Sequence, residues 1–139
     1  MVELLKFEDF DQMYAIMEAS FPDDEYRGYE GQKQLFENPE YKVFIHRNEE
    51  TKEIDGFLSA WEFDDILFFE HFAVSSKVRN GGIGGRMLRE ILTQVNKLTC
   101  LEVELPEGEL EKRRISFYER NGFFYNPYPY TQPSIAPGR

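Results

Sequence analysis

The stretch "AVSSKVRNGGIGGRMLREIL", residues 73–92, places four glycines within five residues, between a basic residue and a helical pattern. The amino terminus of a helix presents unpaired backbone N–H groups and a partial positive charge. Glycines let a bulky anion approach those groups because no Cβ stands in the way. A strand, a glycine loop and a helix in this order predict a phosphate-binding loop. Glycines that serve only a tight turn are the simpler alternative.

Two common phosphate-binding loops differ from this stretch in their spacing. A mononucleotide P-loop requires Lys and then Ser or Thr after its last glycine, whereas Gly85 is followed by Arg86 and Met87. A dinucleotide-binding loop requires G-x-G-x-x-G directly after the strand, whereas Met87 stands at the third glycine position. Glu102 and Glu104 do lie about twenty residues further on, as that motif asks. A nicotinamide-dinucleotide enzyme is therefore kept as an alternative.

A third loop type matches. The segment "VRNGGIGGRML" resembles the R-x-x-G-x-G pyrophosphate loop of the GNAT superfamily of acyl-CoA N-acyltransferases, with Arg79, Gly82 and Gly84 at the signature positions. In addition, "EHFAVSS" is similar to the fourth strand of that family, "CLEVELPE" to its fifth strand, and "RRISFYERNGFF" to its fourth helix with the Tyr-x-x-x-Gly-Phe ending. The resemblance covers most of residues 1–130 and is strongest from Leu67 to Phe124.

The resemblance implies acetyl-CoA as co-substrate, direct transfer of its acetyl group to a primary amine in a ternary complex, and a possible homodimer through a sheet edge. Tyr118, four residues before Gly122, stands where the family places its general acid. The backbone of the fourth strand near Phe72 would stabilise the acetyl oxygen where that strand splays from the fifth. The residues expected to bind the coenzyme are Phe72, Ala73, Val74, Arg79, Asn80, Gly81, Gly82, Ile83, Gly84 and Gly85. A non-catalytic acyl-CoA sensor that keeps the loop is the competing interpretation.

The fold expected from these patterns is a single α/β domain over residues 1–139, with 131–139 as an irregular tail. A mixed, mostly antiparallel sheet of six or seven strands is expected, flanked by about four helices. Periods of two and of 3.6 residues place strands at 2–7, 41–47, 54–63, 66–74, 99–107 and 122–130, and helices at 10–21, 32–38, 83–95 and 109–121.

Carboxylates on the predicted strands are candidates for handling the acceptor. An amine of pKa about 10.4 must lose a proton before it attacks a thioester. A two-residue period puts Glu70 on the same strand face as Ile66, Phe68, Phe72 and Val74. Glu70 is thus a candidate general base or substrate anchor, or a carboxylate paired with a nearby base. Glu102 and Glu104 share one face of the next strand and are candidate substrate-binding residues, or a solvent-facing edge.

Composition and charge limit the partners and the compartment. The chain has 26 Asp and Glu against 16 Lys and Arg, a formal net charge of −10. This charge repels nucleic acid and favours cations, so the expected acceptor is a small amine or a protein amino group. A single cysteine and an amino terminus without signal-peptide features predict a cytoplasmic protein. No apolar run approaches the ~18 residues that cross a bilayer, so no membrane partner is expected.

The remaining reactive side chains are expected to be structural. His46 and His71 alternate with apolar residues on strands and have no partners at metal-ligand spacing, so no metal is expected. Cys100 opens a strand and has no sequence relation to either histidine, which disfavours an acyl-cysteine intermediate. The sequence leaves the identity of the acceptor amine open.

Overall fold

The sheet of this protein is mixed and mostly antiparallel. The computed structural model describes residues 2–78, 81–95, 97–101 and 108–123. Its strands are β1 (Val2–Leu4), β2 (Tyr41–Arg47), β3 (Ile54–Glu62), β4 (Ile66–Val74) and β5 (Leu98–Leu101), in the spatial order β1-β2-β3-β4-β5. Neighbouring strands pair antiparallel except β4 and β5, which are parallel. The described part of the chain thus holds five of the expected six or seven strands, and most of the segment 122–130 lies outside it.

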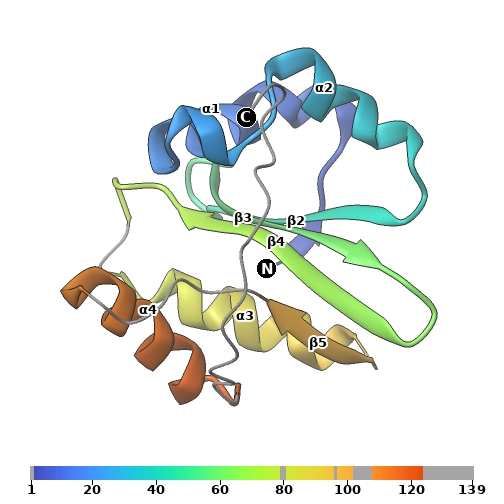
Figure 1. Ribbon diagram of the computed structural model, residues 1–139. Helices are drawn as coiled ribbons and strands as arrows, with labels where there is room; N and C mark the ends of the chain where they lie inside the picture. The colour runs from blue at the N-terminus through green and yellow to red at the C-terminus, as the bar shows by residue number, and fades with distance from the viewer. Residues whose placement is uncertain (1, 79–80, 96, 102–107, 124–139) are drawn as a thin grey trace.

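Helices cover both faces of the sheet. They are α1 (Phe10–Ser20), α2 (Tyr29–Gln34), α3 (Ile83–Gln94) and α4 (Glu109–Arg120), with short 3-10 turns η1 (Phe7–Asp9), η2 (Asp23–Glu25) and η3 (Leu35–Glu37). Figure 1 shows α1 and α2 above the sheet and α3 and α4 below it. The four expected helices are confirmed. The second one begins earlier than expected, at Tyr29, and continues as η3 before Pro39, which cannot extend a helix.

The central strand β3 is buried because both of its faces are covered. All residues from Ile54 to Ala60 are buried. On the α3 side, the expected apolar stripe of that helix supplies Met87, Leu88 and Ile91, each fully buried. A Cβ added to Gly56 would lie 2.8 Å from Met87 Sδ, so glycine allows α3 to pack closely on β3.

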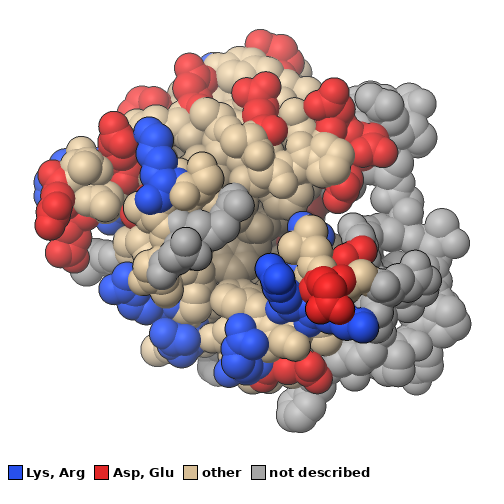
Figure 2. Space-filling model, turned by 90° about the vertical axis from the view of Figure 1, so that its left-hand side faces the viewer, with Lys and Arg blue, Asp and Glu red and all other residues tan. Residues whose placement is uncertain are grey.

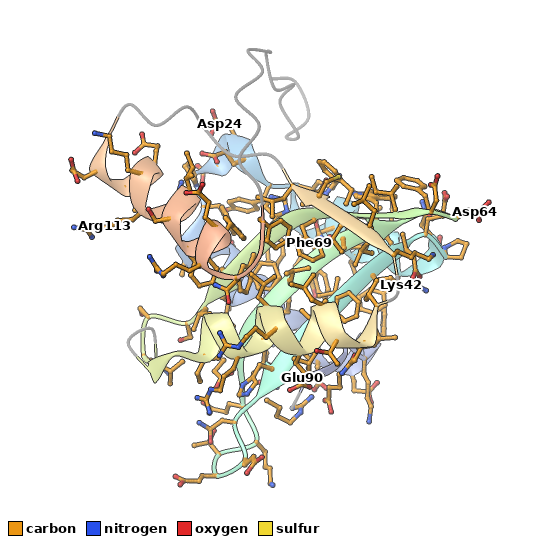
Figure 3. All side chains as sticks on the ribbon, turned by 90° about the horizontal axis from the view of Figure 1, so that it is seen from below. Asp24, Lys42, Asp64, Phe69, Glu90 and Arg113 are labelled. Atoms are coloured by element: carbon orange, nitrogen blue, oxygen red, sulfur yellow. The ribbon has the colours of Figure 1, made fainter. Side chains whose placement is uncertain are left out.

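Two core layers result, one on each face of the sheet. The layer toward α1 includes Phe10, Met13, Met17, Val43, Ile45 and Phe57, and the layer toward α3 includes Phe44, Leu58, Ala60, Leu67, Phe69, Ile83, Met87, Leu88 and Ile91. Figure 3, seen from below, shows Phe69 within the side chains between β4 and the helices, and Arg113 pointing away from the sheet. The two faces of β4 therefore lead into different layers, which decides where its functional side chains point.

Candidate active site

Strand β4 contains a bulge at Glu70. In the pairing with β3, Ser59 faces His71 and Ala60 faces Phe69, so Glu70 is an extra residue without a partner in β3. A bulge changes the direction of side chains and locally interrupts the hydrogen bonds between the two strands. The alternation of side chains between the two faces therefore changes at this residue.

The bulge corrects one expectation from the sequence. A strict two-residue period put Glu70 on the same face as Phe72 and Val74, and this is wrong. Phe72 and Val74 pack against the core layer toward α3, whereas Glu70 contacts Arg27 and Trp61 on the side of α1. The inserted residue shifts the period by one, and sequence periodicity cannot reveal such an insertion.

The carboxylate of Glu70 is held by an arginine from the opposite layer. Arg27 Nη1 and Nη2 donate to Glu70 Oε1 and Oε2 at 2.7 and 2.9 Å, and Trp61 Nε1 donates to Oε2 at 3.3 Å. Burial alone would raise the pKa of Glu70, but His71 and Arg27 outweigh it and lower the pKa to about 2. Of the roles that the sequence left open, the geometry favours a paired carboxylate over a base, because an efficient base has a pKa near the working pH.

His71 contacts the segment between α1 and α2, as Glu70 does. Its side chain is buried, with Nε2 2.6 Å from the carbonyl oxygen of Glu25 and Nδ1 3.6 Å from Glu70 Oε1. The ring of Phe21 packs edge-on against it at 4.9 Å between centroids. The two bulge residues thus fix the segment between α1 and α2 over β4.

The glycine loop opens α3 with an uncapped turn. Gly82 has φ +74°, a left-handed conformation that glycine adopts without strain. As the residue before α3 it has no side chain with which to cap the first-turn N–H groups. A Cβ on Gly84 would lie 3.6 to 3.8 Å from Val74, Phe117 and Phe72, so this turn of backbone lies against β4 and α4. Among the described residues, no atom lies within 4 Å of a Cβ added to Gly82, and a helix start that is open in this way fits a phosphate group.

The other loop residues contribute backbone rather than side chains. Gly81 N–H donates to the carbonyl of Val78 at 3.0 Å, and Gly81 O accepts from Arg86 Nη2 at 3.3 Å. The side chain of Ile83 is buried in the core, which leaves only its backbone for a ligand. Gly85 faces Arg89, since an added Cβ would lie 3.0 Å from Arg89 Nη1. Arg79 and Asn80 lie outside the described residues.

Tyr118 lies beside the strand expected to bind the thioester. Its ring centroid is 6.5 Å from that of Phe72, 5.2 Å from Phe117 and 5.7 Å from Phe123. Burial raises the pKa of Tyr118 to about 12, against a small opposing effect of Arg114. The structure therefore brings together the predicted acid and the predicted oxygen-binding strand, on the face of the sheet that also holds the glycine loop.

The end of α4 sets the position of Tyr118. Gly122 has φ +96°. The N–H groups of Gly122 and Phe123 donate to the carbonyls of Glu119 and Tyr118 at 3.2 and 3.1 Å. These two bonds form a Schellman motif. The stop that the sequence predicted at Gly122 is thus confirmed.

The other predicted site residues lie only partly within the described residues. Ala73 packs on the α1 side, opposite its neighbours Phe72 and Val74. The parallel pairing of β4 with β5 runs from Ile66 to Phe69. The expected splay beyond Phe69 depends on residues outside the described ranges, and so do Glu102 and Glu104.

Two residues of the site were not singled out from the sequence. Trp61 is one of two aromatic residues on β3, with Phe57, and its place on the strand gives no signal of an ion pair. Arg27 does give one, because it is the single basic residue in the segment 8–27, which carries seven Asp and Glu. A lone arginine among so many acids signals a specific ion pair.

The charges on one face of the protein are unevenly distributed. Figure 2 shows mostly Asp and Glu side chains over the upper part of this face, where α1 and the following segment lie, and mostly Lys and Arg over the lower part, where α3 and α4 lie. A recess lies between the two parts. On this face, the upper part therefore attracts cations and the lower part attracts anions.

Within the described ranges, no group of three or more His, Cys, Asp and Glu could hold a metal ion. None of the helices in those ranges is long and apolar enough to cross a bilayer.

Residues 39–124, with the bulged strand, the glycine loop and α4, match the family model of the acetyltransferase (GNAT) domain. The chain belongs to the GNAT family of acetyltransferases. A similar solved structure, from Bacteroides thetaiotaomicron and classed as a GNAT acetyltransferase, is 31% identical with a TM-score of 0.89, over 100% of this chain and 80% of the other. The resemblance stated from the sequence and the fold class are thereby confirmed.

Two further comparisons give weaker similarities. An aminoglycoside antibiotic 6'-N-acetyltransferase from Acinetobacter baumannii has a TM-score of 0.72 at 12% identity, over 97% of this chain and 98% of the other; this shows the fold alone. The Bacillus subtilis protein YjbC, classed as an acetyltransferase, is 36% identical over 64 residues. The match spans 45% of this chain and only 33% of the length of YjbC.

Proposed function

We propose that this GNAT domain transfers the acetyl group of acetyl-CoA to a primary amine, by direct attack within a ternary complex. One observation carries the proposal: the glycine turn, through Gly84, and the ring of Tyr118 both lie against Phe72 and Phe117, on the same face of β4. A phosphate-binding end and a hydrogen-bond donor are then available to one extended thioester ligand.

Different residues would bind the pyrophosphate and stabilise the acetyl oxygen during transfer. The N–H groups of Gly82 to Gly85, together with Arg79, would bind the pyrophosphate, and Gly81, whose own N–H donates to the carbonyl of Val78, would shape the loop. The backbone N–H groups of Phe72, Ala73 and Val74 would stabilise negative charge that develops on the acetyl oxygen. Acetyl-CoA supplies the activated acyl group when bound.

Tyr118 would assist the departure of the sulfur. With a pKa of about 12, its phenol stays protonated at neutral pH. A thiol has a pKa of about 8.5, so a thiolate is the weaker base. Tyr118 would therefore stabilise the departing sulfur by donating a hydrogen bond, and full proton transfer would follow from solvent.

The acceptor amine would lose its proton to water rather than directly to Glu70. At a pKa of about 2, Glu70 is a weak proton acceptor but a permanent negative charge. We therefore assign it the anchoring role. Glu102 and Glu104 are kept as candidate acceptor-binding residues at the neighbouring strand.

Initial-rate kinetics test the proposal. Direct transfer gives double-reciprocal lines that intersect, and a Cys100→Ala variant keeps the activity. Parallel lines, with loss of activity in Cys100→Ala, would instead indicate an acyl-enzyme intermediate. Tight binding of coenzyme A without turnover on any amine would favour the acyl-CoA sensor. If NAD protects the protein against thermal unfolding and coenzyme A does not, the nicotinamide-dinucleotide enzyme would be favoured.

A further inference from the structure

We propose that Glu70 and Trp61 form a binding site for a cationic group of the acceptor, and that Arg27 occupies this site in the structure as an internal substitute. The acceptor would then carry a second basic group besides the amine that is acetylated. This inference rests on the proposed acetyl transfer, whereas the cation site itself can be tested without catalysis.

The surroundings of the Arg27 guanidinium have the chemistry of a cation site. Both carboxylate oxygens of Glu70 accept from it, and its central carbon lies 6.0 Å from the ring centroid of Trp61. Tyr41 packs edge-on against Trp61 at 4.9 Å between centroids. A carboxylate beside aromatic rings attracts organic cations by charge and by the ring quadrupole. An ammonium or guanidinium group of a ligand could satisfy the same partners.

The carboxylate and the ring of the site belong to the sheet, whereas Arg27 belongs to a connecting segment. Glu70 and Trp61 belong to β4 and β3 in the middle of the sheet. Arg27 lies between η2 and α2, and its side chain is 20% exposed against 11% for Glu70. The backbone there is fixed, because Arg27 O accepts from Tyr14 Oη at 2.8 Å. Rotation of the side chain alone would thus move the guanidinium into water and leave the carboxylate to a ligand.

The position of the site indicates an acceptor with two basic groups. Glu70 precedes Phe72 by two residues on β4, and a strand advances about 3.3 Å per residue. The Glu70 carboxylate points to the α1 side and Phe72 to the α3 side, so a cation held at Glu70 would lie across β4, on the order of 7 Å or more from the backbone expected to bind the thioester. A molecule such as a diamine, a polyamine or an amino sugar can place one basic group at each point, and a monoamine cannot.

The surrounding charge favours such a molecule. The segment 8–27, which packs over this end of β4, carries seven acidic residues and Arg27 as its single base. Acidic side chains gather on this side of the recess in Figure 2. A polycation would be attracted to this surface over a distance of about a Debye length, and Arg27 is the one charge on the segment that opposes it.

Thermal unfolding with an added cation tests the site directly. Arg27→Ala leaves the carboxylate and the ring without their cation, so millimolar methylguanidinium or 1,4-diaminobutane is expected to raise its Tm by several degrees. The matched control is Arg47→Ala, which removes an arginine bound to Glu3 and Asp9 at 3.0 and 2.8 Å at the other end of the sheet. A rise no larger in Arg27→Ala than in Arg47→Ala, or one that persists in Arg27→Ala with Glu70→Gln, overturns the proposal.

A more conservative variant can be used if Arg27→Ala does not fold. This variant is Arg27→Lys. Lys makes a point contact with the Glu70 carboxylate instead of a bidentate one, so a cationic ligand displaces it more easily. The diamine is then expected to raise the Tm of Arg27→Lys more than that of wild type. Equal shifts in both proteins contradict the displacement of Arg27.

Steady-state kinetics then connect the site to the reaction. A diamine is expected to have a KM at least tenfold below that of the monoamine of the same chain length. Arg27→Ala is expected to lower the KM of the diamine several-fold, and Glu70→Gln to raise it at least tenfold with a smaller change in kcat. Equal KM values for diamine and monoamine, unchanged in the variants, contradict the inference while acetyl transfer stands. If no amine is acetylated, the proposed function fails, and the unfolding experiment still decides on the cation site.

Discussion

Glu70 and His71 are consecutive residues of β4, and both contact the segment between α1 and α2. Arg27 binds Glu70 at 2.7 and 2.9 Å, and the carbonyl oxygen of Glu25 lies 2.6 Å from His71 Nε2. In a regular strand, neighbouring side chains point to opposite faces. The bulge removes this alternation and also turns Phe72 toward Tyr118. One inserted residue thus arranges both sides of the candidate active site.

The Glu70–Arg27 pair should make stability depend on acidic pH. Because the folded pKa of Glu70 is depressed to about 2, the pair stabilises the protein above the unfolded pKa of about 4.3 and is lost as the pH falls toward 2. Glu70→Gln should cost on the order of 2–3 kcal/mol at pH 7 and much less at pH 2. Urea unfolding at several pH values measures this.

The control for this experiment is Glu62→Gln. Glu62 pairs with Lys97 at 3.3 Å and its side chain is 34% exposed, so its loss should cost under about 1 kcal/mol. If the two substitutions lower the free energy of unfolding equally at pH 7, the Glu70 pair stabilises the protein no more than an exposed ion pair does.

The glycine turn should tolerate a side chain at one position and not at its neighbour. Gly82→Ala places a Cβ on a residue with φ +74° and should cost about 1–2 kcal/mol. It should also weaken binding of coenzyme A, because relief of the strain displaces the first turn of α3. Gly81→Ala is the control, since its added Cβ would meet only Ile83 Cγ1 at 3.9 Å. Equal stability and equal coenzyme affinity in the two variants would contradict this role of Gly82.

Tyr118→Phe should separate catalysis from folding. The ring contacts with Phe72, Phe117 and Phe123 are kept, so the Tm and the affinity for coenzyme A should change little. Loss of the hydroxyl should lower kcat by about tenfold to a thousandfold, the range for removal of one donor to a developing charge or one acid. An unchanged kcat, with chemistry shown to be rate-limiting, would exclude Tyr118 from the reaction.

The pH dependence of the reaction should follow the acceptor amine. An amine of pKa about 10.4 is mostly protonated at pH 7, so kcat/KM should rise about tenfold per unit between pH 7 and 9. The pKa values of Glu70, about 2, and Tyr118, about 12, lie outside this range. An inflection near neutral pH that disappears in Glu70→Gln would restore Glu70 as the general base.

Much of the fold could be predicted because its signals are local. The stripe of α3, the alternation in β2 and the stop at Gly122 each depend on residues a few positions apart. The glycine spacing and the Tyr-x-x-x-Gly-Phe ending likewise indicate the family from the sequence alone. The roles of Glu102, Glu104, Arg79 and Asn80 stay predictions.

The bulge and the ion pair could not be predicted in the same way. An extra residue in a strand leaves no mark on the apolar pattern until the pairing with β3 is known. Arg27 and Glu70 are 43 residues apart, and their contact depends on how α1 packs over the sheet. Long-range packing thus decides the partner of Glu70, which the pattern of a single strand could not show.

The most direct test is release of free thiol from acetyl-CoA by the purified protein, measured with amines and without them. The panel should include diamines, polyamines, amino sugars, amino acids and lysine peptides, and the product should be identified by mass spectrometry. We expect release that depends on the amine, is matched by N-acetylated product, and is fastest with acceptors that carry two basic groups. Coenzyme binding without release on any amine would contradict acetyl transfer, and absence of coenzyme binding would contradict the phosphate-binding role of the loop at Gly82.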